Sequence, residues 1–507
     1  MARLLALVAG ALPVLAFPEA DLSWLGFVAL VPLLVLVRDA PTPREAGVRA
    51  WLAGTGFFAA MHHWLLANVG IFTIVIAPLL GLFWLPWGLA VRRWTGHLRS
   101  PADLALALTV VPAVWVVVEF ARSWDRLAGP WGLLGATQWQ NLRILGLASL
   151  GGVWLVSFAL IAVNVATAAA ASPRHPRPIR LASAGAALGI VALAFVHDAV
   201  RPSPSETSTV RIAGVQTGRV EDGAERFEAH LALSRTLADD APDLVVWGES
   251  SVGFDLPTHP QRAAQAQDLA ADLGAPVLVN IDARKGGEGG IYKSSVLVTP
   301  DGVDGRYDKM RLVPFGEYIP LRSVLGWAAD VTEAAEEDRR RGEGLAVLDV
   351  VPGDGGRTFQ IGPLVCFESA FPDMSRELAR MGAEVVVLQT ATTTFQGSWG
   401  QAQHAALSAV RAVESGRPVV HAAMSGVSAV FDAEGRRLAW LDHDETGTHI
   451  AEVDLTSGRT PFVRFRDWVP YLSIAIAIAA LLGDARTRNA GPHRLWADRR
   501  SHRAPVS

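Results

Sequence analysis

Long apolar runs dominate the first 200 residues and predict that this part of the chain lies in a membrane. A helix needs about 20 apolar residues to cross the hydrocarbon core of a bilayer. Seven runs approach or reach this length and an eighth lies near the C-terminus: residues 4–17, 22–37, 48–66, 71–91, 104–120, 144–171, 181–196 and 468–482. With 50% hydrophobic and 19% charged residues over 507 positions, the composition is that of a membrane protein. We expect a multi-pass α-helical membrane domain with about eight spans.

The first two runs are shorter than a typical span, which leaves two arrangements open. They form either a spanning pair or one re-entrant hairpin, and we favour the pair. Arg3 followed by an apolar stretch also resembles the start of a signal peptide. Cleavage there would remove one span and reverse the orientation of all the others, so we expect a retained helix.

Arginines follow every second run and set the expected orientation. They lie at positions 38, 44, 49, 92, 93, 99, 174, 177, 180, 486, 488, 494, 499, 500 and 503. If eight helices alternate, all of these segments fall on one side, which the positive-inside rule assigns to the cytoplasm. Both termini are then cytoplasmic, and the block between the spans lies outside. The expected domains are a seven-span region (1–200), an extracytoplasmic domain (201–466), a last span (467–484) and a basic cytoplasmic tail (485–507).

The block between the spans has the pattern of an α/β domain. Its strand candidates are residues 210–216, 244–247, 276–281, 295–299, 360–367, 384–388, 418–423, 428–431 and 449–453. Its helix candidates are residues 224–238, 260–273, 376–381 and 400–415. Turn residues at 300–302 and 432–435 predict hairpins. About 265 residues are enough for a complete core, with helices covering the sheets.

Cys366 is the only cysteine of the chain, and it closes a short apolar run. A lone cysteine is either a small buried hydrophobe or a nucleophile. Glu249 follows a predicted strand in the same way, and Lys309 lies in a loop with Glu317 eight residues later. Residues at strand ends converge on one rim of an α/β domain. A carboxylate can accept the proton of a thiol and a lysine can stabilise an oxyanion, so Glu249, Lys309 and Cys366 together suffice for acyl transfer through a thioester.

Seven segments carry a resemblance to a known family. WGES at 247–250, YDKMRLVPFGEYIP at 307–320 and CFES at 366–369 resemble the carbon–nitrogen hydrolase (nitrilase) superfamily. LVPFGEYIP, together with residues 54–64, 118–122, 129–138 and 410–418, is similar to its membrane branch, the apolipoprotein N-acyltransferases. The resemblance covers roughly residues 20–480. It implies a nitrilase-like α-β-β-α sandwich as the extracytoplasmic catalytic domain.

The resemblance also implies a reaction and a site. Glu249 resembles the general base, Lys309 the oxyanion-stabilising residue and Cys366 the nucleophile, with Glu317 and Glu368 as supporting carboxylates. Cys366 would take an acyl chain from a phospholipid and pass it to the α-amino group of a diacylglyceryl-cysteine at a lipoprotein N-terminus, in the bacterial cell (inner) membrane. No metal or organic cofactor is expected. The net charge of −4 gives no basic field for nucleic acid.

The sequence departs from the family pattern at several places near the expected site. Phe367 stands where the family often has Tyr after the nucleophile, and Lys293 follows Tyr292 where many members have Asn. Residues 390–397 also differ from the segment that many members carry there. We expect these changes to alter contacts with the substrate more than the core chemistry.

Three other interpretations remain at this stage. The chain could be a membrane-tethered amidase for a small amide, a Cys–His hydrolase that uses His404 or His421, or a non-catalytic binding protein. The LVPFGEYIP segment argues against the first, and the Glu249, Lys309 and Cys366 set argues against the other two. Residues 322–344 fit neither helix nor strand periodicity, so we expect a solvated loop, with a mobile lid as the functional alternative. Its apolar part around Leu325 is the candidate lid or acyl groove.

Overall fold

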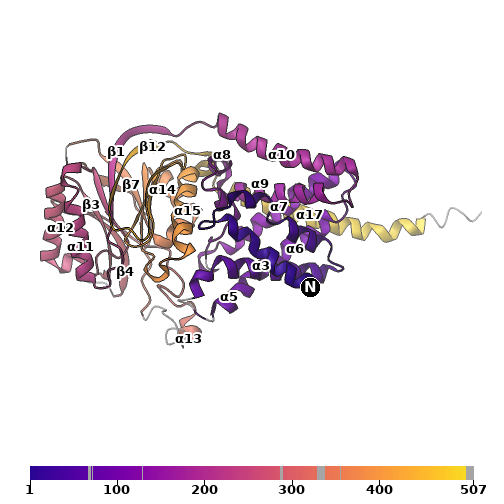
Figure 1. Ribbon diagram of the computed structural model, residues 1–507, viewed down its shortest axis with the longest axis horizontal. Coiled ribbons are helices and arrows are strands. Elements are labelled where there is room, and N and C mark those ends of the chain that lie inside the picture. Colours follow the sequence, from indigo (N-terminus) through magenta and orange to yellow (C-terminus); the bar gives the residue numbers. More distant parts are fainter. Residues whose placement is uncertain are drawn as a thin grey trace, which may run out of the picture.

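The computed structural model describes residues 1–66, 70, 72–127, 129–285, 289–327, 337–353 and 355–497, without the side chains of 126, 324, 325 and 487–497. A helical domain and a two-sheet domain lie end to end, and the last helix runs back along the helical domain (Figure 1). Of the predicted lid, 322–344, residues 328–336 lie outside the described residues, as does the side chain of Leu325. The end of the basic tail, 498–507, lies outside them as well.

The helical domain is built, among the described residues, from nine α-helices of the first 200 positions and from the last helix of the chain. Its bounds are α1 (Ala2–Ala11), α2 (Val31–Arg38), α3 (Pro43–Met61), α5 (Phe72–Gly81), α6 (Leu85–Thr95), α7 (Pro101–Arg122), α8 (Leu142–Leu145), α9 (Ala148–Ala171), α10 (Arg177–Val200) and α17 (Trp468–Ala497). Local sequence explains several of the starts. At α7, Ser100 and Asp103 form a capping box and Pro101 takes the first helical position, where its missing N–H costs nothing.

Five helices among the described residues are long and apolar enough to cross a membrane. They are Phe72–Thr95, Pro101–Arg122, Ala148–Ala171, Arg177–Val200 and Trp468–Arg486. They correspond to the last five predicted runs. The first two runs form the shorter apolar helices Ala2–Ala16 and Ser23–Arg38, and the third forms α3. Proline explains part of this shortening, since Pro13 lies at the start of a 3-10 turn that ends the first helix.

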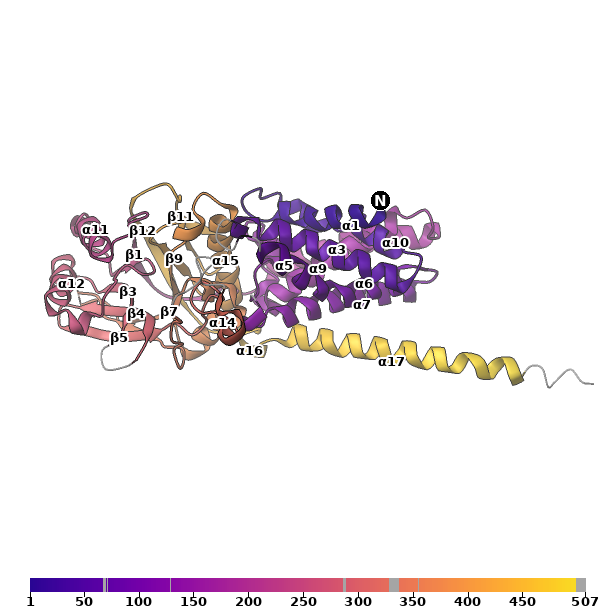
Figure 2. The ribbon, with the colours of Figure 1, turned by 90° about the horizontal axis from the view of Figure 1, so that it is seen from below.

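The last helix is longer than the sequence predicts. We expected a span over residues 468–482 followed by a separate tail, whereas α17 continues without a break to Ala497. Figure 2 shows it beside α7 and then projecting beyond the helical domain. The arginines after the apolar part do not end the helix, because Arg and Lys have good helix propensity.

The second domain is a sandwich of two six-stranded sheets. The strand orders are β12-β1-β2-β3-β4-β5 and β11-β10-β9-β8-β7-β6. The bounds are β1 (Ser205–Gln216), β2 (Leu244–Trp247), β3 (Val277–Arg284), β4 (Ile291–Thr299), β5 (Gly302–Asp308), β6 (Leu348–Val350), β7 (Phe359–Val365), β8 (Val385–Thr390), β9 (Val419–Ala423), β10 (Ser428–Phe431), β11 (Arg437–Leu441) and β12 (Gly447–Ser457). The inner faces share one apolar core, with Ile212, Val246, Ile361 and Val387 among its members.

Helices cover both outer faces, so the predicted α-β-β-α sandwich is confirmed (Figure 1). The helices of this domain are α11 (Gly223–Arg235), α12 (Pro260–Leu273), α13 (Arg322–Leu325), α14 (Pro372–Met381), α15 (Trp399–Ser415) and α16 (Pro461–Phe465). All nine predicted strands are present, and both predicted hairpins join strands, β4 to β5 and β10 to β11. The strand predicted over 360–367 is wrong at its end: β7 stops at Val365, and Cys366 begins a 3-10 turn.

Helices α14 and α15 lie between the second sheet and the helical domain (Figures 1 and 2). Their apolar residues belong to the same core as those of the membrane helices, which makes the two domains one packed body. Polar contacts reinforce the junction. The helical path of α9 breaks at Gly151 and Gly152, and the freed N–H of Val153 donates to Glu414 of α15 at 2.7 Å. The indole N–H of Trp131 donates to Gln403 at 3.0 Å.

Candidate active site

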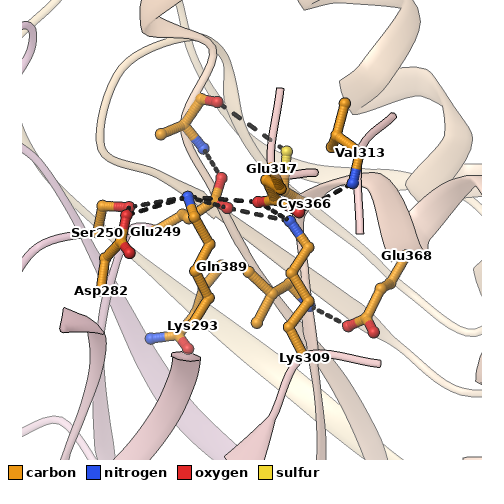
Figure 3. Close-up of polar contacts among 12 residues, drawn as sticks. Glu249, Ser250, Asp282, Lys293, Lys309, Val313, Glu317, Cys366, Glu368 and Gln389 are labelled. Atoms are coloured by element: carbon orange, nitrogen blue, oxygen red, sulfur yellow. Dashed lines mark hydrogen bonds and ion pairs between the residues drawn. The ribbon is translucent and has the colours of Figure 1, made fainter. Parts of the chain in front are cut away.

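The expected catalytic residues come from both sheets and meet where their strands end. Glu249 follows β2, Lys309 follows β5 and Cys366 follows β7. The two sheets are joined at this point, because the N–H of Glu249 donates to the carbonyl of Thr390, the last residue of β8, at 3.0 Å. The amide of Gln389 adds a second link by donating to the carbonyls of β2 and β3 at 2.9 and 3.0 Å. Figure 3 shows the resulting cluster.

Lys309 is a fully buried cation held between two carboxylates. Its Nζ lies 2.7 Å from Oε1 of Glu317 and 3.2 Å from Oε1 of Glu249. Burial alone would lower the pKa of Lys309, but the two negative charges outweigh it and raise the pKa well above the usual value. Lys309 therefore stays protonated, which suits a donor to a developing oxyanion and not a base.

The segment 313–318 is folded so that Glu317 reaches back to Lys309. The N–H of Phe315 donates to the carbonyl of Tyr318 at 2.7 Å, and Phe315 takes a left-handed φ of 65°. The second oxygen of Glu317 accepts from the N–H of Val313 at 2.9 Å. The tight turn explains why the LVPFGEY segment accompanies Lys309, the expected oxyanion-stabilising residue.

Glu249 uses its two oxygens differently. Oε1 accepts from Nζ of Lys293 at 2.9 Å and from Nζ of Lys309 at 3.2 Å, and Oε2 accepts from the N–H of Ala391 at 3.1 Å. Burial raises the pKa of Glu249, but the charges of Lys293 and Lys309 outweigh it and lower the pKa to about 2. At neutral pH Glu249 is a carboxylate and can accept a proton.

Cys366 lies beside this carboxylate on a strained turn. Its Sγ contacts the carbonyl oxygen of Ala391 at 4.0 Å, so the backbone of a single residue contacts both the thiol and Oε2 of Glu249. The φ of Cys366 is +48°, a conformation that costs energy for a residue with a side chain and is typical of functional sites. Desolvation by the surrounding protein and the charge of Glu249 raise the pKa of the thiol, against the opposing effect of Lys309. The thiol is therefore neutral at rest and loses its proton only as it attacks.

Glu368 shapes the loops around the nucleophile. Oε1 accepts from the hydroxyl of Tyr307 at 2.8 Å and from the N–H groups of Met310 and Arg311 at 2.7 and 3.0 Å. Oε2 accepts from the N–H of Val365 at 2.8 Å. The carboxyl is fully buried, and burial raises its pKa. Glu368 thus ties the nucleophile turn to the loop of Lys309.

Phe367 points away from the charged cluster, toward the junction with the helical domain. Its ring packs edge to face on Phe371, with 5.0 Å between the centroids. It also closes over Gly129, where an added Cβ would lie 2.7 Å from Cζ of Phe367. The aromatic ring therefore links the nucleophile turn to the membrane region by packing, without the hydroxyl that a tyrosine would supply.

The Cys–His interpretation is not supported by the position of His404. Nε2 of His404 donates to the backbone carbonyl of Cys366 at 3.1 Å and contacts Oγ of Ser369 at 2.9 Å. Burial lowers the pKa of His404 to about 4, so the ring is neutral. His404 fixes the backbone of the nucleophile turn, and its partner His421 binds Thr390 and Ser408.

Sequence reasoning missed several members of the site. Lys293 was noted only as a departure from the family, and Ser250, Asp282, Gln389 and Ala391 were not singled out. The sequence offered one indication of this role for Lys293. A lysine directly before a continuously buried strand segment, 294–298, is unusual unless its charge is paired. In the part of the chain that the structure describes, no group of three or more His, Cys, Asp or Glu side chains is arranged to hold a metal ion.

Comparison with known proteins finds relatives that match both domains. Residues 209–460 match the carbon–nitrogen hydrolase family and residues 9–166 match the apolipoprotein N-acyltransferase N-terminal domain. The apolipoprotein N-acyltransferase of Azotobacter vinelandii is 32% identical over 499 residues, covering 94% of this chain and 93% of its own. That of Pseudomonas putida is 31% identical over 511 residues, covering 95% of each. A nitrilase-superfamily amidase from Nesterenkonia AN1 overlaps 53% of this chain and 96% of its own, at 22% identity and a TM-score of 0.37.

The sandwich fold, with Glu249, Lys309 and Cys366 at its strand ends, defines a cysteine-dependent enzyme of the carbon–nitrogen hydrolase class. The helical domain and the full-length relatives narrow this class. The chain belongs to the apolipoprotein N-acyltransferase family. It is an acyltransferase and a membrane protein, and the small-amide hydrolase is not favoured.

Proposed function

We propose that the protein moves an acyl chain from a phospholipid to the α-amino group of the diacylglyceryl-cysteine at an apolipoprotein N-terminus, with Cys366 as the carrier. The observation that carries this proposal is the meeting of Glu249, Lys309 and Cys366 at the ends of strands from both sheets, with Glu249 and Lys309 buried and Cys366 partly exposed. The relatives named apolipoprotein N-acyltransferase match both the helical and the catalytic domain, which supports the choice of substrates.

In the first half-reaction, Glu249 removes the thiol proton as Sγ of Cys366 attacks the ester carbonyl of the phospholipid. The oxyanion is stabilised by Lys309. Its ammonium has three hydrogens, of which two are directed at Glu317 and Glu249, so one remains for the substrate. The tetrahedral intermediate collapses, the proton passes from Glu249 to the leaving oxygen, and a lysophospholipid departs. The acyl group is left on Cys366 as a thioester.

In the second half-reaction, the lipoprotein amine attacks the thioester carbonyl. Glu249 takes the proton that the amine loses, and Lys309 again stabilises the oxyanion. The C–S bond breaks, the new amide leaves, and the proton returns to the sulfur of Cys366. Because each substrate reacts in turn with the same thiol, the kinetics are ping-pong.

Three further residues support this chemistry in the proposal. Glu317 holds Lys309 in place at 2.7 Å, and Glu368 anchors the nucleophile turn through four hydrogen bonds. Phe367 packs the turn against Phe371 and Gly129, and thereby against the membrane region. None of the three takes part in bond making; each fixes the distance between the nucleophile and its partners.

We propose that the catalytic domain lies on the outer face of the bacterial inner membrane with both termini in the cytoplasm. The proposed boundaries are 1–200, 201–466, 467–484 and 485–507, and the arginine pattern supports this orientation. Each buried methylene contributes about 0.8 kcal/mol, so exposing a whole acyl chain to water costs on the order of 10 kcal/mol. A catalytic domain packed through α14 and α15 on membrane helices avoids that cost.

Mass spectrometry of the full-length protein tests the proposal. Incubation with phospholipid should add one acyl mass to the Cys366 peptide, and a diacylglyceryl-cysteine peptide should then remove it and gain the same mass on its amine. Cys366→Ala should form no adduct while remaining folded. Release of ammonia from a small amide without any acyl adduct would refute the transfer reaction.

A further inference from the structure

Besides Lys309, the site contains a second lysine, Lys293, which has no role in the reaction proposed above. It lies on β4, and its side chain is 13% exposed. Its Nζ is 2.9 Å from Oε1 of Glu249 and 3.1 Å from Oγ of Ser250. The same ammonium pairs with Asp282 at 3.6 Å and with Glu317 at 3.5 Å. Figure 3 shows Lys293 and Lys309 approaching Glu249 together.

The two lysines differ in the number of donors that remain for a substrate. An ammonium group has three hydrogens. For Lys293 they are directed at Glu249, at Ser250 and at the carboxylates of Asp282 and Glu317. Among the residues that the structure describes, Lys309 has two such partners, Glu249 and Glu317. Lys293 is therefore placed to hold protein groups and not to bind the reacting carbonyl.

The group that Lys293 holds is the catalytic carboxylate. By occupying Oε1 of Glu249, the two lysines leave Oε2 beside Ala391, whose carbonyl oxygen contacts Sγ of Cys366. A rotation of the carboxylate away from this position would remove the base from the thiol. Ser250, the second partner of Lys293, has a φ of +57°, so the chain just after Glu249 needs an outside contact to keep this conformation.

The backbone of the same residue also positions the other lysine. The carbonyl of Lys293 accepts the N–H of Lys309 at 2.8 Å, directly after β5 ends. Lys293 thus fixes Glu249 through its side chain. Through its main chain it also fixes the start of the loop that carries Lys309.

We propose that Lys293 is a positioning residue for the general base, holding the carboxylate of Glu249 in the orientation and charge state that remove the proton of Cys366. This inference rests on the proposed thioester mechanism. It divides two tasks between two lysines, since Lys309 stabilises the oxyanion and Lys293 prepares Glu249.

The charges around Glu249 explain why one more cation matters. Glu249, Glu317 and Asp282 face Lys293 and Lys309, and Arg339 pairs with Asp282 at 3.4 Å. The remaining neighbours, the thiol of Cys366 and the ring of His404, are neutral. Without Lys293, the three carboxylates face two cations, Lys309 and Arg339. The pKa of Glu249 then rises by about one to three.

The test uses Lys293→Met, Lys293→Gln and Lys293→Arg in the full-length protein, in micelles that contain phospholipid. The readouts are the rate of acyl-thioester formation on Cys366 between pH 3 and 8, and the apparent KM for the phospholipid. We expect Lys293→Met and Lys293→Gln to slow acylation by about 10-fold or more at neutral pH with little change in KM. We also expect the acylation rate of these two variants to fall with pH between about pH 5 and 3, where the wild type stays nearly level, and Lys293→Arg to recover both properties.

The control is Lys285→Met, which removes a lysine that pairs with Asp308 at the edge of the same sheet. It should retain the wild-type rate and pH profile. Equal rates and equal pH profiles in wild type, Lys293→Met and Lys293→Gln, measured per folded molecule, would overturn the inference. If Lys293→Met does not fold, the comparison of Lys293→Gln with Lys293→Arg decides whether Lys293 positions Glu249. Failure of the wild type itself to form a thioester would instead overturn the proposed function.

Discussion

Glu368 lies in the same turn as Cys366, and Glu368→Gln tests whether this turn depends on the carboxylate of Glu368. All four groups bonded to it are donors, three on Oε1 and one on Oε2. A glutamine has only one acceptor oxygen, and its NH₂ group is a donor. If the amide oxygen keeps the three contacts of Oε1, the NH₂ must face the N–H of Val365, the residue before Cys366.

The size of the effect follows from this one lost contact. A buried N–H without an acceptor costs about 1–3 kcal/mol. The other three bonds weaken because the acceptor loses its charge, but the substitution also removes the cost of burying a carboxylate, and these two effects oppose each other. We therefore expect a net loss of about 1–3 kcal/mol, located at the nucleophile turn. If half of this loss moves Cys366 off its attack position, acylation slows by about 2- to 12-fold.

The assay is the rate of thioester formation on Cys366, with the unfolding temperature measured on the same preparation. Glu384→Gln is the control, because Glu384 is also a buried carboxylate with three donors but lies at the opposite end of β8, about 20 Å from Ala391. It should lower the unfolding temperature and leave the acylation rate of the folded protein unchanged. Wild-type acylation in Glu368→Gln would refute the role we derive for Glu368.

Two other predictions follow from the site. The pKa of Glu249 is lower in the folded protein, about 2, than its usual 4.5, so its contribution to stability is complete above about pH 4.5 and is lost as the pH falls toward 2. The unfolding temperature should therefore drop more steeply between pH 5 and 3 in wild type than in Glu249→Gln; equal slopes would contradict the pairing with two lysines. Gly129→Ala should cost about 1–2 kcal/mol and slow acylation, because Gly129 has a φ of +68° and a Cβ would lie 2.7 Å from Phe367. Gly185→Ala, where a Cβ meets no atom within 4 Å and the residue lies inside helix α10, should lower neither the unfolding temperature nor the rate. An equal loss in both variants would show that contact with Phe367 is not the cause.

Local patterns were enough to find most of the secondary structure. Runs rich in Val, Ile and Leu predicted β2, β8 and β9 within a residue or two, since buried parallel strands are continuously apolar. The strands β5, β6 and β11 were missed for the same reason. β5 contains Gly302, Asp304 and Gly305, and β6 has only three residues, so neither carries an apolar run. Their pairing with neighbouring strands, and not their own propensity, makes them strands.

The sequence could bring Glu249 and Cys366 forward as candidates because they follow β2 and β7, which apolar runs reveal, whereas Lys309 follows β5 and was selected by its chemistry and its neighbouring motif. The turn after β7 was not predicted, because the left-handed φ of Cys366 is imposed by the contacts of Glu368 and His404 with the turn. The extension of α17 to Ala497 was also missed, since charge and apolar length indicate where a membrane span ends and not where a helix ends.

The sequence by itself determined the membrane region, the α/β class of the catalytic domain and the candidate residues Glu249, Lys309 and Cys366, because hydrophobic periodicity and residue chemistry are local properties. Only the tertiary structure decided that Lys293, 44 positions from Glu249, lies 2.9 Å from it. It also decided that α15 joins the catalytic sheet to the membrane helices through Glu414 and Val153. Such contacts depend on how two sheets and a helical domain pack, and no spacing along the chain encodes that distance.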